Sequence, residues 1–280
     1  LILMQTITLI GMALDTHADV ATDQSTSIGI IGGADGPTSV YIAGSKQIRL
    51  IDWLIRIFGR AGTDSKPENI EGLVAHQNVA TKAQRQEARE KGLLILINKQ
   101  NPIDEGYKPD DLSPIKYYAT DRSEAGRYMR KEAADRFHEL VEAADSEGFK
   151  IVMTTAYRSY GFQQILWNNY VANEGEAAAS RFSAKPGQSE HQSGLAVDVS
   201  SPSVNYALTE RFGETEEGIW LANNAHEYGF IIRFPKDKEN ITGYLYEPWH
   251  IRYVGQPIAE EIYSKTLTLE EYLDQYEEEN

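Results

Sequence analysis

The segment Ser189–Ser200, SEHQSGLAVDVS, restricts the fold most, because its second half alternates like a β-strand that has one polar face. Successive side chains of a strand point to opposite faces of the sheet. Asp198 and the small Ala196 would share one face. The branched residues that would face the core are Leu195, Val197 and Val199. His191 precedes Gly194, whose backbone freedom would let the chain turn and bring the imidazole back towards Asp198.

A second polar pair lies in EPWH, residues 247–250. Glu247 and His250 are three positions apart, so a regular strand would place them on opposite faces. Pro248 disfavours helix for the residue before it and interrupts a regular strand. We therefore expect a bend here that lets both side chains face one cavity.

The composition restricts what these polar residues can bind. The chain has no cysteine and six histidines, so any metal site must use His, Asp or Glu. His191, Asp198 and His250 would supply three ligands, the number a catalytic zinc uses when one position stays open for water. Glu247 would then be left to accept a proton. The alternative is that each half of this set is only a hydrogen-bonded polar pair.

Other features of the composition concern partners. A formal net charge of −15 argues against nucleic acid or an anionic membrane surface as the main partner. Among the remaining histidines, His226 lies in a predicted helix and is interpreted as structural, and His138, on the long amphipathic helix, is interpreted as partly buried or on the surface. Arg233 and Arg252 could line a cleft or pair with acidic groups, and the sequence leaves both possibilities open.

The spacing of apolar residues predicts helices beside a mainly antiparallel sheet, which is an α+β fold. Predicted helices begin near Thr81 and span about 123–148, 161–172 and 215–229. Predicted strands span 150–156, 195–200, 230–234 and 249–254. Residues 93–103, LLILINKQNPI, are apolar enough for a strand or an extended arm.

We divide the chain into four parts on these patterns: an N-terminal appendage (1–65), a linker and helix (66–89), a main domain (90–265) and an acidic C-terminal tail (266–280). The apolar run 1–14 is too short to span a bilayer, and it is interpreted as a remnant of an anchor or signal, or as a buried element.

The rest of the appendage contains two further features. IGIIGGADGPTSVYIAG, residues 28–44, has turn signals between two apolar runs and predicts a hairpin-like module. It resembles a short glycine-rich segment of the β subunit of sodium-translocating decarboxylases. Residues 45–62 predict an amphipathic helix that could lie on a membrane or pack on the neighbouring domain.

Three ordered motifs resemble the VanY-type zinc D-alanyl-D-alanine carboxypeptidases, of the group that includes lysostaphin-like enzymes and the hedgehog domain. SEHQSGLAVD fits S-x-H-x-x-G-x-A-x-D, and EPWH fits E-x-W-H. AYRSYGFQ, residues 156–163, resembles the family's Y-R-S-Y-x-x-Q. The match covers about 90–255 and implies a zinc site in a cleft on the sheet.

The resemblance also implies a role for individual residues. The positions that match zinc ligands are His191, Asp198 and His250. The positions that match catalytic groups are Glu247, the base, and Arg158, which would stabilise an oxyanion. The positions assigned to substrate binding or to the pocket wall are Ser189, Gln163, Tyr157 and Trp249.

The function implied is removal of the C-terminal D-alanine from peptidoglycan stem peptides by an enzyme with one Zn²⁺ per chain. The alternatives are an L,D-carboxypeptidase, a peptidoglycan endopeptidase, or a non-catalytic zinc- or cell-wall-binding module. A transport subunit, suggested only by GGADGPT, is opposed by the lack of long apolar spans. We expect an extracytoplasmic monomer, secreted or membrane-anchored, with a membrane contact through its N-terminal segment.

Overall fold

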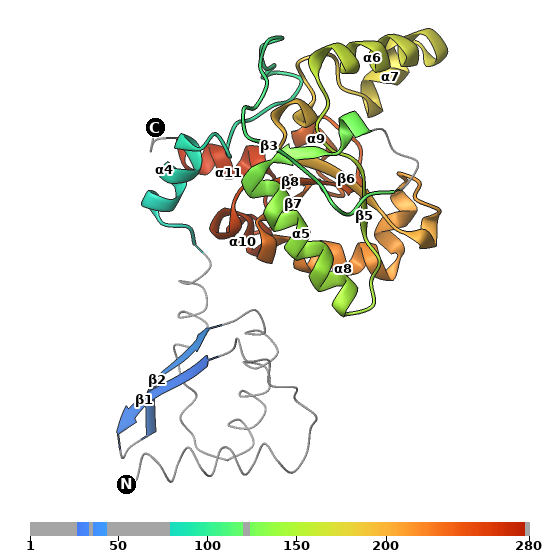
Figure 1. Cartoon of the computed structure of the whole chain (residues 1–280). Helices are drawn as coiled ribbons and strands as arrows, with labels where there is room; N and C mark the ends of the chain where they lie inside the picture. Colours follow the sequence, from blue (N-terminus) through green and yellow to red (C-terminus); the bar gives the residue numbers. More distant parts are fainter. Residues whose placement is uncertain (1–26, 34–35, 44–78, 120–123, 278–280) are drawn as a thin grey trace. The chain divides into compact units, whose positions relative to one another are not determined.

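The computed structural model describes residues 27–33, 36–43, 79–119 and 124–277, within two compact units, 1–70 and 71–280 (Figure 1). In the first unit, β1 (Ser27–Gly33) pairs antiparallel with β2 (Gly36–Ala43), as the hairpin-like pattern predicts. The apolar run 1–14 and the predicted helix 45–62 lie outside the described residues.

The second unit is built on a four-stranded antiparallel sheet in the order β5-β6-β8-β7 (Figure 1). Its strands are β5 (Val152–Thr155), β6 (Ala196–Ser200), β7 (Phe230–Phe234) and β8 (Glu247–Tyr253). A separate short pair joins β3 (Leu112–Pro114) to β4 (Tyr128–Arg130). The mainly antiparallel α+β fold expected from the sequence is confirmed.

Helix α5 (Lys131–Ser146) supplies much of the hydrophobic core. Phe137 is fully buried and meets Phe230 of β7 edge to face, with ring centroids 6.3 Å apart. Burying such a phenylalanine contributes about 3–5 kcal/mol relative to alanine. The residues of segment 195–199 that join this core are Leu195, Val197 and Val199, as their alternation predicts.

The predicted start of this helix, residue 123, is wrong. Residues 128–130 form β4, and the helix begins only at Lys131. Tyr128 has helical spacing to the later apolar residues, but it pairs with Pro114 of β3. This pairing with a distant segment overrides the local pattern.

The remaining helices lie around the four-stranded sheet (Figure 1). They are α4 (Lys82–Glu90), α6 (Tyr160–Glu174), α7 (Glu176–Phe182), α8 (Glu216–Asn224), α9 (Glu239–Thr242), α10 (Gln256–Ser264) and α11 (Leu269–Gln275). Side chains cap several helix starts, since each accepts a hydrogen bond from an otherwise unpaired backbone N–H. Thr81 caps α4 in this way and Ser159 caps α6.

Two segments extend the unit beyond the sheet. Residues 93–103 form no strand and run as an arm, in which the Leu93 and Ile95 carbonyls accept hydrogen bonds from Arg252. The acidic segment predicted as a tail contains α11, whose Leu269 and Tyr272 are fully buried. These two apolar residues pack the helix onto the core. Among the described residues, no helix has the length and apolarity needed to cross a membrane.

Candidate functional site

Strands β6 and β8 place two of the candidate ligands side by side. Asp198 and His250 are directly opposite each other in the antiparallel register. Directly opposed residues of such a pair lie on the same face of the sheet. The two side chains therefore meet, with His250 Nδ1 3.0 Å from Asp198 Oδ1.

The third candidate ligand comes from the 3₁₀ turn Glu190–Ser193, just before β6. Gly194 follows with φ +69°, a left-handed conformation that a glycine adopts without strain. The His191 Nδ1–H donates to the Ala156 carbonyl at 2.7 Å. Because Nδ1 carries this proton, Nε2 keeps its lone pair, and it lies 3.3 Å from Asp198 Oδ2.

These three side chains fit a small metal ion. Their ligand atoms lie within 4.8 Å of one another, and all three residues are buried. Tetrahedral ligands at about 2.0–2.1 Å from zinc are roughly 3.3 Å apart. The separations here are similar, although His250 Nδ1 lies 3.0 Å from Oδ1 of Asp198 and His191 Nε2 lies 3.3 Å from Oδ2. A His₂Asp set leaves a fourth position for water or substrate. The group could therefore hold a zinc-like ion with an open coordination site.

A local irregularity brings Glu247 to the same place. Ile232 and Phe234 of β7, two positions apart, pair with Ile251 and Glu247 of β8, four positions apart. Strand β8 thus has two extra residues here, which form a bulge of the kind expected at Pro248. Beside this irregularity, Glu247 Oε2 lies 3.8 Å from His250 Nδ1.

The environment of Glu247 suits a proton carrier. Its side chain is 13% exposed. Burial is the main cause that raises its pKa to about 7, while His250 acts in the opposite direction and Asp198 raises it further. A carboxyl group with a pKa near neutrality can both accept and release a proton at physiological pH.

The ligands themselves are strongly coupled. Burial disfavours ionisation of Asp198, but His191 and His250 outweigh it and hold the pKa of Asp198 well below its usual range. Burial likewise lowers the pKa of His250, but hydrogen bonding to Asp198 and Glu190 prevails and raises it to about 9. The site therefore has a strong preference for positive charge.

Arg158 adds a fixed cation at the edge of this group. Its backbone N–H donates to the His191 carbonyl at 3.1 Å, and its Nη1 donates to Gln163 Oε1 at 2.7 Å. Burial is the main cause that lowers the pKa of Arg158, and the negative charges of Asp198 and Glu247 oppose this shift. Its buried Nε has no hydrogen-bond partner among the described residues.

Of the four predicted substrate-binding residues, Gln163 is the one whose side chain is hydrogen-bonded to Arg158. Gln163 is buried beside Arg158, and its Nε2 donates to the Ala184 carbonyl at 2.6 Å. The other three are only neighbours of site residues in the chain: Ser189 precedes the 3₁₀ turn, Tyr157 precedes Arg158, and Trp249 precedes His250 in β8 and packs against the hydrophobic core. No hydrogen bond or ion pair joins their side chains to the three candidate ligands within the described ranges.

Sequence reasoning missed Glu190, which lies beneath His250. This carboxylate is 3% exposed. Its Oε1 accepts from Arg233 Nε at 2.8 Å and from Arg252 Nη1 at 2.6 Å. Its Oε2 lies 3.5 Å from His250 Nε2. The two arginines are therefore paired with a buried carboxylate, and no local pattern around Glu190 signals these distant partners.

Two other histidines lie in structural settings, as the sequence suggests for His226. The His226 ring stacks on Tyr263, with centroids 3.7 Å apart. His138 Nε2 accepts from the Lys116 backbone N–H at 3.1 Å. Neither belongs to the His/Asp/His group.

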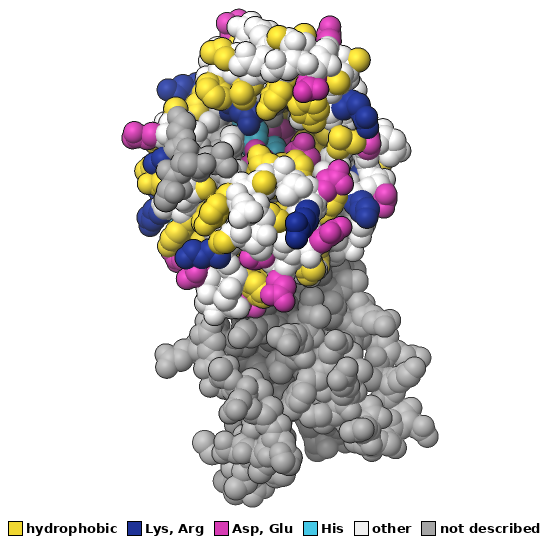
Figure 2. Space-filling model, turned by 90° about the vertical axis from the view of Figure 1, so that its right-hand side faces the viewer, with side chains coloured by type: hydrophobic (Ala, Val, Ile, Leu, Met, Phe, Trp, Pro, Cys, Tyr) yellow, Lys and Arg dark blue, Asp and Glu magenta, His cyan; other side chains and the backbone are white. Residues whose placement is uncertain are grey.

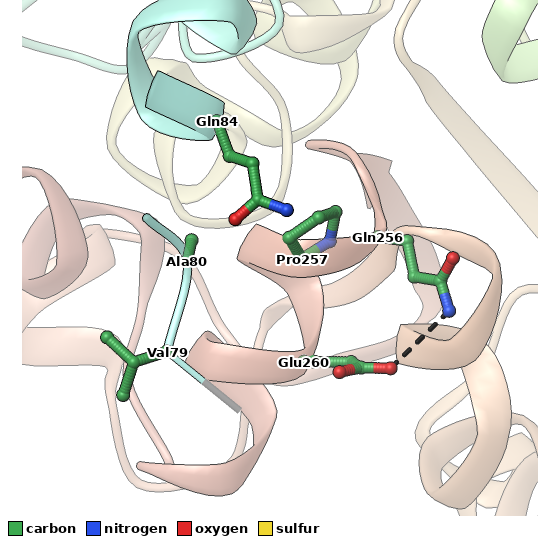
Figure 3. Close-up of a pocket in the computed structure, with 6 residues that line it drawn as sticks. All are labelled: Val79, Ala80, Gln84, Gln256, Pro257 and Glu260. Atoms are coloured by element: carbon green, nitrogen blue, oxygen red, sulfur yellow. Dashed lines mark hydrogen bonds between the residues drawn. The ribbon is translucent and has the colours of Figure 1, made fainter. Parts of the chain in front are cut away.

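The surface of the second unit agrees with a site in a depression. Figure 2 shows a hollow with histidine and acidic side chains at its floor and hydrophobic side chains around its rim. A different pocket lies between α4 and α10 (Figure 3). Its lining residues are Val79, Ala80, Gln84, Gln256, Pro257 and Glu260. None of them belongs to the candidate site.

Comparison with known proteins identifies the family. The VanY family model, described as D-alanyl-D-alanine carboxypeptidase, matches residues 126–256. The putative carboxypeptidase YodJ of Bacillus subtilis (strain 168) is 46% identical over 185 residues, covering 66% of this chain and 68% of that protein. The chain belongs to the VanY family. It is accordingly an enzyme of the D-Ala-D-Ala metallocarboxypeptidase class.

Two solved structures of this family extend the likeness to the fold. The LD-carboxypeptidase LdcB is 46% identical, with a TM-score of 0.62, covering 64% of this chain and 84% of its own. A vancomycin resistance D,D-pentapeptidase VanY, in complex with Zn(II), is 35% identical, with a TM-score of 0.55. That match covers 65% of this chain and 98% of the VanY chain. VanY-family relatives thus include both D,D- and L,D-carboxypeptidases.

Proposed function

We propose that this protein hydrolyses the peptide bond before the C-terminal D-alanine of peptidoglycan stem peptides, with one Zn²⁺ held by His191, Asp198 and His250. The observation that carries the proposal is the convergence of these three buried side chains beside Glu247. The Zn(II) complex of the related VanY supports zinc as the metal.

Each of the other residues has a defined task in this proposal. Zinc, when bound, supplies a Lewis acid that polarises the scissile carbonyl and lowers the pKa of a water molecule. Glu247 accepts a proton from the attacking water and passes it to the leaving amine. Arg158 stabilises the negative charge that develops on the carbonyl oxygen, because its guanidinium is fixed and always charged.

The substrate is held by the residues around Arg158. Gln163 and Ser189 are proposed to bind the peptide and its terminal carboxylate, and Tyr157 and Trp249 to shape the pocket. A terminal carboxylate of the substrate would form a hydrogen bond with Gln163. A longer peptide has no carboxylate at this place and would leave a buried polar group without that partner, which costs free energy.

A second candidate is L,D-carboxypeptidase activity, which removes D-alanine from a tetrapeptide. The observation that favours it is the 46% identity to LdcB, whose structure is described as that of an LD-carboxypeptidase. The catalytic groups named above serve both reactions, since only the residue before the scissile bond differs.

This function places the protein where its substrate lies, outside the cytoplasmic membrane. We propose that it acts there as a monomer, either secreted or held at the membrane by its N-terminal segment. Its partner is the peptidoglycan stem peptide and not nucleic acid, in agreement with the net charge of −15.

The deciding experiment is mass spectrometry of muramyl pentapeptide and tetrapeptide after incubation with the zinc-loaded protein. Loss of one alanine from the pentapeptide supports the D,D assignment, and loss from the tetrapeptide alone supports the L,D assignment. The Glu247→Gln variant is the control and should release alanine at least about 100-fold more slowly. Release from neither peptide would overturn both assignments in favour of an endopeptidase or a binding module.

A further inference from the structure

Glu190 occupies a position between the candidate metal site and the interior of the protein. It lies next to His191 in the chain, but its side chain is directed towards His250, on strand β8. Its Oε1 accepts hydrogen bonds from Arg233 Nε at 2.8 Å and from Arg252 Nη1 at 2.6 Å, so two buried arginines stabilise the carboxylate form of Glu190.

The facing atoms of Glu190 and His250 have no other partner. His250 Nε2 and Glu190 Oε2 are both buried, and neither has a hydrogen bond to any other described residue. They lie 3.5 Å apart. Buried polar atoms that lack a partner are costly, so this pair has a strong reason to remain together.

The contact determines which nitrogen of His250 can bind a metal. A carboxylate only accepts hydrogen bonds, so Glu190 favours the ring form in which Nε2 carries the proton. The lone pair is then on Nδ1, the atom that lies 3.0 Å from Asp198. Metal-binding histidines commonly use such a partner to fix the ring's tautomer and orientation.

Glu190 is itself held from two sides. Arg233 also binds Glu270 of α11 through both terminal nitrogens, at 2.8 and 2.6 Å. Arg252 also donates to the carbonyls of Leu93 and Ile95, each at 2.9 Å. These contacts fix the two arginines in place. The Glu190 carboxylate cannot rotate without breaking the bonds from both arginines to its Oε1, so its direction towards His250 is set by the fold.

We propose that Glu190 is a positioning residue, which orients His250 and keeps its Nδ1 free to bind the metal ion. The inference rests on the proposed zinc site and adds a residue outside the three ligands. A purely structural Glu190 would stabilise the fold through Arg233 and Arg252 alone, and its loss would leave the metal affinity of the folded protein unchanged.

The variant Glu190→Gln separates these roles. Its amide oxygen can still accept from the two arginines, so its NH₂ group would face His250 Nε2. Two N–H donors cannot pair, so the variant disfavours the ring form that leaves Nδ1 free. Loss of such a partner typically weakens metal binding by about 10–100-fold.

The control is Glu261→Gln. Glu261 is another fully buried carboxylate, which accepts from the Ala80 backbone N–H at 3.0 Å and from Lys265 Nζ at 2.6 Å. None of its contacts is with a candidate ligand. Its replacement should lower thermal stability while leaving zinc affinity within about 2-fold, which accounts for any general effect of removing a buried charge.

The experiment measures the dissociation constant of Zn²⁺ for each full-length protein by competition with a chelator, at one temperature where all are folded. We expect about 10–100-fold weaker binding for Glu190→Gln and near-native binding for Glu261→Gln. Equal zinc affinity in Glu190→Gln and the native protein would overturn the positioning role alone. Absence of zinc binding by the native protein would instead overturn the proposed function.

Discussion

At the scale of single residues, the site depends on a backbone conformation that few side chains tolerate. Gly194 has φ +69°, and a Cβ added there would lie 3.0 Å from the Leu112 side chain. We expect Gly194→Ala to lower the free energy of unfolding by about 1–3 kcal/mol and to weaken zinc binding, because the turn that carries His191 must shift. Denaturant unfolding and chelator competition measure the two effects.

A matched control is Gly148→Ala, after helix α5. Gly148 also has a positive φ, +90°, but an added Cβ would meet no atom within 4 Å. This variant should lose stability through backbone strain alone and keep its zinc affinity. If both variants bind zinc as tightly as the native protein, Gly194 serves the fold and not the site.

The second prediction at this scale concerns Glu247. We expect Glu247→Gln to reduce kcat by about 10²–10⁴, because the amide cannot accept the proton of water, while zinc affinity changes by only a few fold. Steady-state kinetics and metal analysis of the same preparations test this. Activity within a factor of ten of the native enzyme would exclude Glu247 as the base.

At the scale of elements, α11 stabilises the network beneath the site. Its Glu270 binds Arg233, whose side chain is completely buried. Removing one partner of a buried pair leaves an uncompensated charge, so Glu270→Ala should cost about 3–5 kcal/mol of unfolding free energy. Urea unfolding measures this loss.

An exposed ion pair provides the comparison. Glu87 lies 2.9 Å from Lys91 on α4, and both side chains are largely in solvent. Such pairs contribute about 0–1 kcal/mol, so Glu87→Ala should have little effect. A Glu270→Ala cost no larger than that of Glu87→Ala would show that α11 adds nothing to the network.

The elements also show what sequence reasoning can and cannot reach. The alternation around Asp198 is local, so strand β6 and its two faces were predictable. The position of Tyr128 depends on pairing with residues 112–114, which no helical spacing reveals. Glu190 acquires its role from Arg233 and Arg252, 43 and 62 positions away, so its neighbours in the sequence carry no signal of it.

At the scale of the whole molecule, stability should depend on pH through His226. Burial lowers the pKa of this imidazole to about 4, from an ordinary value of 6.5. The unfolded chain therefore binds more protons between these values, so stability is complete above about pH 6.5 and declines as the pH falls towards 4. His226→Phe, which keeps a ring against Tyr263, should show a shallower decline.

Thermal unfolding of both proteins between pH 4 and 8 tests this expectation. The carboxyl groups of Glu227 and Glu260 are present in both, and burial raises their pKa values, so they contribute with the opposite sign. Because His226 is partly exposed, the difference should be modest. Parallel curves for the two proteins would rule out His226 as a source of acid sensitivity.

The bulge in β8 has a consequence for how such a protein could change its activity over evolution. The proposed base and one proposed ligand are separated only by Pro248 and Trp249, and beside the register irregularity of this strand Glu247 Oε2 lies 3.8 Å from His250 Nδ1. Deleting one residue there would turn Glu247 to the other face and leave His250 opposite Asp198. A single loss of chain length could thus convert a hydrolase into a metal-dependent receptor for the same peptide.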